Sequence, residues 1–472
     1  MKPYYEAEAV TLYLGDCIEV MRQMPEASVD AVVCDPPYGL EFMGKAWDRH
    51  ESPHAFQQWC EAWACEAYRV LKPGGMIASF GGMRTHHRMV SGIEDAGFEI
   101  RDSLCWIFGS GFPKSLNVSA ALRGLPACTC DVLDESGAVS PGSPFRPVGA
   151  GVGAVQRADS DFHNLKCSRC GGVRRENIPD GLGTTLKPAV EYICLARKPL
   201  GGTVAANVLA HGTGALNIDA SRIGTTKRVP GSTSREHDWL NRRFKAQTGE
   251  ESGHDPNVGR WPANVLLDEE AAALLDATVG ELTSGKMMPA HTDAVRNTYG
   301  QNAAGGYTTM ETYGDRDGPS RFFYTAKSSR SEREAGLEAL PGKTPGEMTD
   351  RKDGAAGANN PRAGAGRGQD GVVALRDGGR GSERHNSHPT VKPVSLMRWL
   401  CTLVTPPGGT ILDPFLGSGS TCLGALDAGF RFVGIEQDEH YLDTARTRIT
   451  HRHLLEVETR ESNEDIPQGR LM

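Results

Sequence analysis

The sequence lacks any apolar run long enough to cross a membrane, and its longest apolar stretches have only the length of a strand. The first ten residues also lack the apolar centre of a signal peptide. Twelve cysteines are scattered over 472 residues without the close spacing of a small disulfide-bonded domain. We therefore expect a cytoplasmic protein that does not contact a membrane.

Positive charge is not in excess either, because the formal net charge is −8. This does not exclude a nucleic-acid enzyme, since local basic patches rather than the total charge contact phosphates. The chain is too long for one ordinary core, and its 39% hydrophobic content is enough to build a large one. We expect a catalytic domain that carries insertions.

Strand and helix signals alternate at both ends of the chain, which predicts a parallel sheet covered by helices. Near the N-terminus, strands are expected at residues 11–14, 31–34, 76–80 and 98–108, and helices at 17–24 and 56–70. Near the C-terminus, helices are expected at 394–404, 421–428 and 439–453, and strands at 410–412 and 432–435. The middle has no sustained period, and the Gly-, Ala-, Asp- and Arg-rich residues 344–387 predict a flexible linker.

The first candidate site is the tetrapeptide Asp35-Pro36-Pro37-Tyr38, which follows a strand-like run. A Pro-Pro turn at this place needs no catalytic role. However, an exocyclic amine is a poor nucleophile because its lone pair is delocalised into the ring. The Asp35 carboxylate and the rigid Pro36 carbonyl can accept both of its hydrogens and stabilise the charge that develops. Since Tyr38 can stack on a base that has left the helix, the tetrapeptide indicates a site for a base amine.

The second candidate site is the loop from Asp413 to Gly419, which also follows a strand-like run. Its glycines let the backbone approach a ligand closely, and the next helix presents its positive N-terminus. The following strand ends at Glu436, where a carboxylate is placed to accept hydrogen bonds from ribose hydroxyls. A lone Gly-x-Gly is more often a plain turn, but the combination indicates a nucleoside cofactor.

The order of the two sites predicts the fold. In a dinucleotide-binding sheet, the strand, glycine loop and helix come first in the chain. Here they come last, and the tetrapeptide at residues 35–38 comes first. We therefore predict an α/β fold with a permuted Rossmann-like sheet, chain ends that meet in space, and a large central insertion.

Residues 9–110 and 386–450 resemble the amino-DNA methyltransferases of the β motif order, in which the catalytic motif precedes the cofactor motif. Within that family they look most similar to adenine-specific members of phage and prophage type. A looser likeness extends to residues 186–191, 259–264 and 320–324. The resemblance implies an S-adenosylmethionine-dependent methyltransferase sheet. It also implies adenine N6 as the target, because the first position of the tetrapeptide is typically Asp or Asn for adenine and Ser for cytosine.

The resemblance also implies roles for individual residues. The catalytic residues would be Asp35, Pro36, Pro37 and Tyr38. The residues around S-adenosylmethionine would be Asp16, Lys392, Asp413, Pro414, Phe415, Gly417, Gly419 and Glu436. Lys392 belongs to a His-Pro-Thr-Val-Lys-Pro segment, which could otherwise be a plain capped entry to a helix.

Six segments follow from these assignments. Residues 1–112 are expected to form the catalytic half of a methyltransferase domain, and residues 388–455 the cofactor-binding half. Between them we expect an insertion at 113–189, a target-recognition region at 190–343 and the linker at 344–387, with a polar tail at 456–472. Candidate contacts to duplex DNA are Arg222, Lys227, Arg228, Arg242, Arg243 and Lys245, although most could form a solvated face.

Four cysteines of the insertion form two pairs, Cys128 with Cys130 and Cys167 with Cys170. Four thiolates are the right number for a tetrahedral structural zinc. The 36 residues between the pairs are more than a compact zinc finger has, and free buried thiols are the alternative. The sequence favours neither a zinc site nor free thiols at these four cysteines.

The sequence thus predicts a site-specific methyltransferase that transfers a methyl group from S-adenosylmethionine to adenine N6 in duplex DNA. Cytosine-N4 methylation uses the same geometry, and an RNA base or a protein amide could be presented similarly. Outside the enzymes, a non-catalytic, zinc-bearing DNA-binding protein is the alternative, although a degenerate core has no need to keep Asp35 and both glycines. A homodimer and a cognate restriction enzyme are open questions.

Overall fold

A computed structural model describes residues 1–41, 46–109, 111, 115–126, 165, 173, 178–224, 259–283, 316–326, 329–343, 384–388 and 390–464. The chain forms two compact units, one made of Met1–Gly109 with Val190–Met472 and one made of Ser110–Ala189. Within the described ranges, no helix has both the length and the apolar character that crossing a membrane requires.

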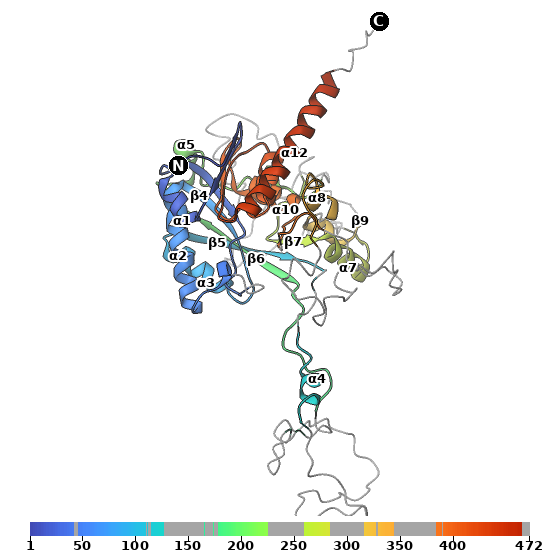
Figure 1. Cartoon of the computed structure of the whole chain (residues 1–472). Helices are drawn as coiled ribbons and strands as arrows, with labels where there is room; N and C mark the ends of the chain where they lie inside the picture. The colour runs from blue at the N-terminus through green and yellow to red at the C-terminus, as the bar shows by residue number, and fades with distance from the viewer. Residues whose placement is uncertain are drawn as a thin grey trace, which may run out of the picture. The chain divides into compact units, whose positions relative to one another are not determined.

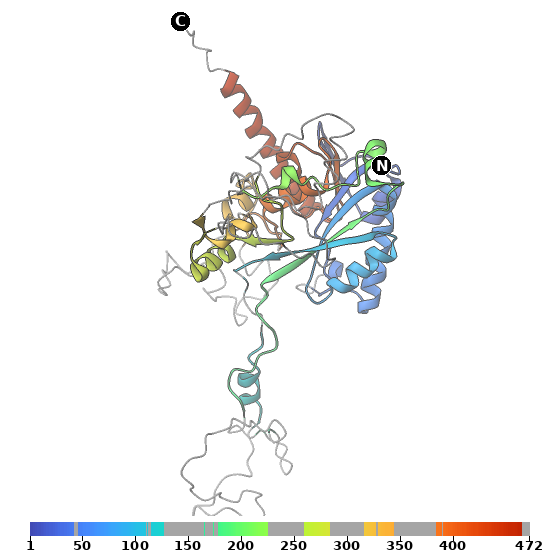
Figure 2. The same ribbon diagram turned by 180° about the vertical axis from the view of Figure 1, so that it is seen from behind.

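The larger unit is built on a ten-stranded sheet with the order β1-β2-β12-β11-β3-β4-β6-β5-β7-β10. Its strands are β1 (Tyr5–Ala7), β2 (Val10–Leu14), β3 (Val29–Cys34), β4 (Leu71–Gly81), β5 (Glu99–Ile107), β6 (Val190–Arg197), β7 (Val265–Asp268), β10 (Tyr324–Ala326), β11 (Thr410–Asp413) and β12 (Arg431–Glu436). All are parallel except β1 and β6. Strand β6 lies antiparallel between β4 and β5 (Figure 2). The prediction of a parallel sheet is therefore wrong for β1 and β6.

The strand order confirms the permuted α/β fold. If the chain is followed from β11 to its C-terminus and then from its N-terminus, the strands β11, β12, β2, β3 and β4 come first to fifth. Their order in the sheet is then 3-2-1-4-5, which is that of a Rossmann fold. Strand β12 pairs with β2 from Phe432 opposite Val10 to Glu436 opposite Leu14, so segments from the two ends of the chain lie side by side.

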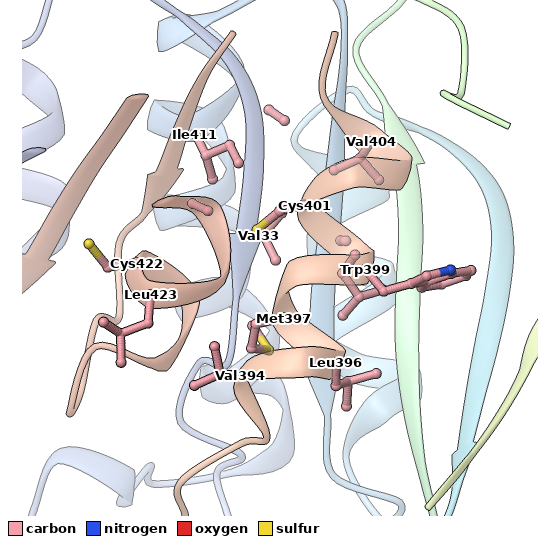
Figure 3. Close-up of a cluster of buried hydrophobic side chains, with 14 of the residues drawn as sticks. Val33, Val394, Leu396, Met397, Trp399, Cys401, Val404, Ile411, Cys422 and Leu423 are labelled. Carbon is pink, nitrogen blue, oxygen red and sulfur yellow. The ribbon is translucent and has the colours of Figure 1, made fainter. Parts of the chain in front are cut away.

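Helices cover both faces of this part of the sheet (Figure 1). One face carries α1 (Cys17–Gln23), α2 (Pro53–Val70) and α3 (His86–Asp95), and the other carries α10 (Val394–Val404), α11 (Ser420–Asp427) and α12 (Glu439–Glu464). Alternate residues of β3 enter the two cores, since Val32 packs with α1 to α3 and Val33 packs with α10 and α11 (Figure 3). Helix α12 continues to Glu464, into the stretch expected as a polar tail.

Within the described residues, the larger unit also contains α5 (Val204–His211), α7 (Glu269–Val279), α8 (Arg330–Glu334), and the short pair β8 (Leu282–Thr283) and β9 (Arg316–Asp317). Three short 3-10 helices, Ala46–Asp48, Asp219–Ser221 and Pro319–Phe322, belong to it as well. The smaller unit contains α4 (Val118–Arg123), which begins where the Asn117 side chain accepts a hydrogen bond from the Ala120 amide at 2.9 Å. Asn117 also pairs with Gly183 in an isolated bridge.

Candidate functional site

The loops that follow β3 and β11 meet at the point where the strand order reverses. In open α/β sheets, ligands bind at the carboxyl ends of the strands at such a switch point. A cavity of about 210 Å³ lies there. The predicted site residues that line it are Asp16, Asp35, Pro36, Pro37, Tyr38, Lys392, Asp413, Pro414, Phe415, Gly417 and Glu436. The two candidate sites therefore share one cavity.

The tetrapeptide is held by the end of a buried strand and by its own tyrosine. Every residue of β3 is buried, so the chain leaves the core at Asp35. The Tyr38 hydroxyl donates a hydrogen bond to Asp35 Oδ1 at 2.8 Å. The backbone carbonyl of Tyr38 accepts one from Thr85 Oγ1 at 2.6 Å. Its ring lies against Gly82, where an added Cβ would stand 2.9 Å from Tyr38 Cδ2. The backbone and the ring of Tyr38 are thus both fixed.

Lys392 lies beside this carboxylate. Its Nζ donates to Asp35 Oδ2 at 2.7 Å and to the Tyr38 hydroxyl at 3.2 Å. It also lies 3.2 Å from Glu191 Oε2 of β6 and 4.8 Å above the centre of the Phe80 ring. Burial lowers the pKa of Lys392, but the two carboxylates outweigh it and the pKa is raised overall, so the side chain stays charged.

The glycine loop is tied to the end of β12. Glu436 Oε2 accepts a hydrogen bond from the Gly417 amide at 2.8 Å, and Oε1 accepts one from the Asp438 amide at 2.9 Å. Each carboxylate oxygen keeps a second lone pair for a ligand hydroxyl. The imidazole of His388 lies over Gly417 and edge-on to the ring of Tyr441, with 4.7 Å between the two ring centres.

Burial shifts the pKa of two cavity residues in directions that favour their neutral forms. It raises the pKa of Asp413 to about 7, although hydrogen bonds from the Thr421 side chain and the Phe415 amide act against the shift. It lowers the pKa of His388 to about 4, helped by the charges of Lys392 and Arg448. His388 at neutral pH is therefore uncharged, and its buried Nδ1 has no hydrogen-bond partner within the described part of the chain.

Two other predicted cofactor residues have structural roles in the chain itself. Asp16 caps α1, because its side chain accepts hydrogen bonds from the amides of Ile18 and Glu19, and it also lines the cavity. Gly419 does not line the cavity. It begins α11 with a φ of +84°, and an added Cβ would stand 3.0 Å from Cβ of Ala445 on α12. The structure thus explains Gly419 by the packing of two helices.

Several cavity residues were missed by the sequence analysis. Trp59 of α2 and Tyr441 of α12 line the cavity, and Trp59 packs on Phe415 with 5.6 Å between ring centres. Helical spacing does not distinguish an aromatic residue that faces a cavity from one that faces the core. Glu191 does not line the cavity but contacts the lining residues Tyr38 and Lys392, and it was also missed, although the segment 186–191 of the looser likeness includes it.

The predicted zinc ligands Cys128, Cys130, Cys167 and Cys170 lie outside the described residues, as do Lys227, Arg228, Arg242, Arg243, Lys245 and residues 344–383 of the expected linker. The last four residues of that segment, 384–387, are described, and they are ordered by contacts: Arg384 pairs with Lys343, and Asn386 is buried. Among the residues that are described, no group of His, Cys, Asp and Glu could hold a metal ion. Arg222 is described, and it forms an ion pair with Asp219 at 2.8 Å and lies over the ring of Trp261.

Comparison with known proteins connects the two ends of the chain with DNA methylases. A family model described as DNA methylase matches residues 29–120 and 357–447. The type II methyltransferase M.BamHI of Bacillus amyloliquefaciens is 37% identical over 81 residues, which are 16% of this chain and 18% of that protein. The type II methyltransferase M.ScaI of Streptomyces caespitosus is 38% identical over 74 residues, 16% of this chain and 23% of that protein.

Two solved structures were also compared. The PvuII DNA methyltransferase, cytosine-N4-specific, has a TM-score of 0.41 and 13% identity, with 95% of this chain and 88% of that chain covered. The complex of M1.HpyAVI with S-adenosylmethionine has a TM-score of 0.36 and 13% identity, with 93% and 98% covered. Scores of this size do not carry an argument about function. The sequence matches support a likeness to DNA methyltransferases in the two halves that form the cavity, and they span less than a quarter of the length of either curated relative.

Proposed function

We propose that this protein is an S-adenosylmethionine-dependent methyltransferase that modifies an exocyclic amine of a base in duplex DNA. The observation that supports the proposal most strongly is the meeting of Asp35 and the glycine loop in one cavity at the switch point of the sheet. One loop brings a carboxylate to an amine, and the other brings backbone amides and a ribose-binding carboxylate to a nucleoside.

The cavity fits S-adenosylmethionine by its charge and its shape. Its lining includes the carboxylates of Asp16 and Glu436, which suit the cationic groups and the ribose hydroxyls of that molecule. The backbone of Gly417 lies close to the His388 ring, since an added Cβ would come within 2.9 Å of His388 Nε2, so a glycine here keeps side-chain atoms out of the cavity wall. When bound, S-adenosylmethionine would supply an activated methyl group.

The residues after β3 would prepare the target amine. In the proposed mechanism, the Asp35 carboxylate and the Pro36 carbonyl accept hydrogen bonds from the amine, and the ring of Tyr38 stacks on the flipped base. Accepting both hydrogens draws the nitrogen toward tetrahedral geometry and stabilises the positive charge that it gains in the attack. Pro36 is buried, its own ring fixes its φ, and Pro37 after it restricts its ψ, so the direction of its carbonyl is limited before the base arrives.

We further propose adenine N6 as the methylated atom, on the identity of Asp35 at the first position of the tetrapeptide. The same two acceptors would serve cytosine N4. Residues 190–343 are the proposed target-recognition region, and the described residue Arg222 is its candidate DNA contact.

Methyl transfer from labelled S-adenosylmethionine tests the proposal. The purified protein is offered duplex DNA, RNA and a protein mixture in parallel, and equilibrium dialysis reports cofactor binding in the same preparation. Label should enter duplex DNA. Label that enters RNA or protein alone would overturn the substrate class, and binding without transfer to any acceptor would overturn the enzymatic function.

A further inference from the structure

Lys392 places a positive charge next to the carboxylate that the proposed function assigns to the target amine. Its Nζ lies 2.7 Å from Asp35 Oδ2, and only 8% of the Lys392 side chain is exposed. The next residue, Pro393, caps α10, and the aromatic ring of Phe80 lies under the ammonium group. Lys392 is therefore an enclosed part of the site rather than a mobile surface lysine.

A neutral pair of Asp35 and Lys392 is poorly suited to the proposed chemistry. The attacking amine gains positive charge before it loses its proton, and a fixed negative charge stabilises that state. Lys392 is bonded to the same carboxylate and opposes the effect. Both oxygens of Asp35 also have partners already, because Oδ1 accepts from Tyr38.

Glu191 supplies a second negative charge at this point. Its Oε2 lies 3.2 Å from Lys392 Nζ and 3.3 Å from the Tyr38 hydroxyl, and 24% of its side chain is exposed. The antiparallel direction of β6 explains its position. Tyr192 pairs with Gly81 at the carboxyl end of β4, so Glu191 reaches the same sheet edge as Asp35 from the beginning of its own strand.

We propose that Glu191 is a positioning residue that offsets the charge of Lys392, so that Asp35, Lys392 and Glu191 together present one net negative charge to the target amine. The Tyr38 hydroxyl connects the three groups, since it accepts from Lys392 and lies within hydrogen-bond distance of both carboxylates. This inference rests on the proposed methyl transfer and adds a charge requirement to it.

Two substitutions at position 191 separate charge from shape. Glu191→Gln removes the charge and keeps the size, and it should lower kcat on the order of 100-fold while KM for DNA changes far less. Glu191→Asp keeps the charge and should retain most of kcat. Melting temperature and cofactor affinity, measured for both variants, should match the wild type. Equal losses of kcat in the two variants, or no loss in Glu191→Gln, would overturn the proposal.

A double-mutant cycle with Lys392→Met tests the charge count directly. If Glu191 acts by offsetting Lys392, Glu191→Gln should cost at least about tenfold less in the Lys392→Met protein than in the wild type, because no positive charge is left to offset. Equal costs in the two backgrounds would overturn the proposal. If Lys392→Met proteins are inactive, the comparison of Gln with Asp at position 191 decides. A wild type that methylates no substrate contradicts the proposed function itself, whereas an active wild type with an unaffected Glu191→Gln variant contradicts only this inference.

Discussion

Glu436 holds Gly417 by its backbone, with 2.8 Å between Glu436 Oε2 and the Gly417 amide nitrogen. The φ of Gly417 is +54°, and an added Cβ would stand 2.9 Å from His388 Nε2. Position 417 is therefore restricted both by its backbone conformation and by the space above it.

Gly417→Ala should weaken binding of S-adenosylmethionine by more than about tenfold, because the new methyl group adds steric blockage to the strained backbone. Gly429→Ala is a matched control. Its φ of +76° imposes a similar strain, but nothing lies within 4 Å of an added Cβ there. Titration calorimetry measures both affinities, and thermal unfolding measures both stabilities. Comparable cofactor affinity in the two variants would contradict the role of position 417.

Asp413→Asn should change how stability depends on pH. Burial raises the pKa of Asp413 to about 7 in the folded chain, so between about pH 4 and pH 7 the folded state binds a proton that the unfolded state releases. The contribution of Asp413 is thus fully present at low pH and is lost as pH rises through 7. The free energy of unfolding of the wild type, relative to Asp413→Asn, should fall by roughly 4 kcal/mol across this range. Urea unfolding at a series of pH values measures it, and a constant difference would contradict the raised pKa.

Arg448→Met should destabilise the glycine loop, because Arg448 binds its residues by hydrogen bonds. The buried guanidinium donates to the Ser418 carbonyl at 2.6 Å and lies 3.3 Å from Oγ of Ser418 and of Ser420. Losing hydrogen bonds from a charged donor to buried acceptors should cost about 2–4 kcal/mol. Arg446→Met on the same helix removes an exposed pair with Asp443 and a contact over the ring of Tyr4, and it should cost about 1 kcal/mol or less. Urea denaturation compares the variants, and equal costs would argue against the support role of Arg448.

Metal analysis of the purified protein decides between the two interpretations of Cys128, Cys130, Cys167 and Cys170. If they form a zinc site, one zinc per chain should be found, and substitution of Cys167 and Cys170 by Ser should remove it. If no metal is found and all four thiols react freely in the folded protein, the cysteines are not a zinc site.

The regular elements around the cavity were largely predictable, because their periods and stop signals are strong. The expected helix at 394–404 is confirmed with the same bounds, and the helix expected at 56–70 does end at Val70. Helix α3 was not predicted, because it begins with three polar residues and buries only a few side chains. Strands β7 and β10 have four and three residues, too few to show a period.

The contacts inside the cavity were less predictable. Motif spacing assigned Asp35 and Lys392 to separate functions, yet their side chains form an ion pair across 357 positions of sequence. Such a contact depends on the pairing of β3 with β11 and on the packing of α10 against β3 and β4, which local pattern does not determine. Glu191 reaches the site because β6 runs antiparallel to β4, and the alternation of helices and strands in the sequence does not predict that direction.

The most direct test of the central claim is mass spectrometry of nucleosides from duplex DNA treated with the protein and S-adenosylmethionine. The wild type should produce N6-methyladenine. Asp35→Ala should bind the cofactor and produce no modified base, while Glu19→Ala, which removes an exposed carboxylate of α1, should behave like the wild type. N4-methylcytosine in place of N6-methyladenine would contradict the assigned base. Near-normal methylation by Asp35→Ala would contradict the central claim that this carboxylate prepares the target amine.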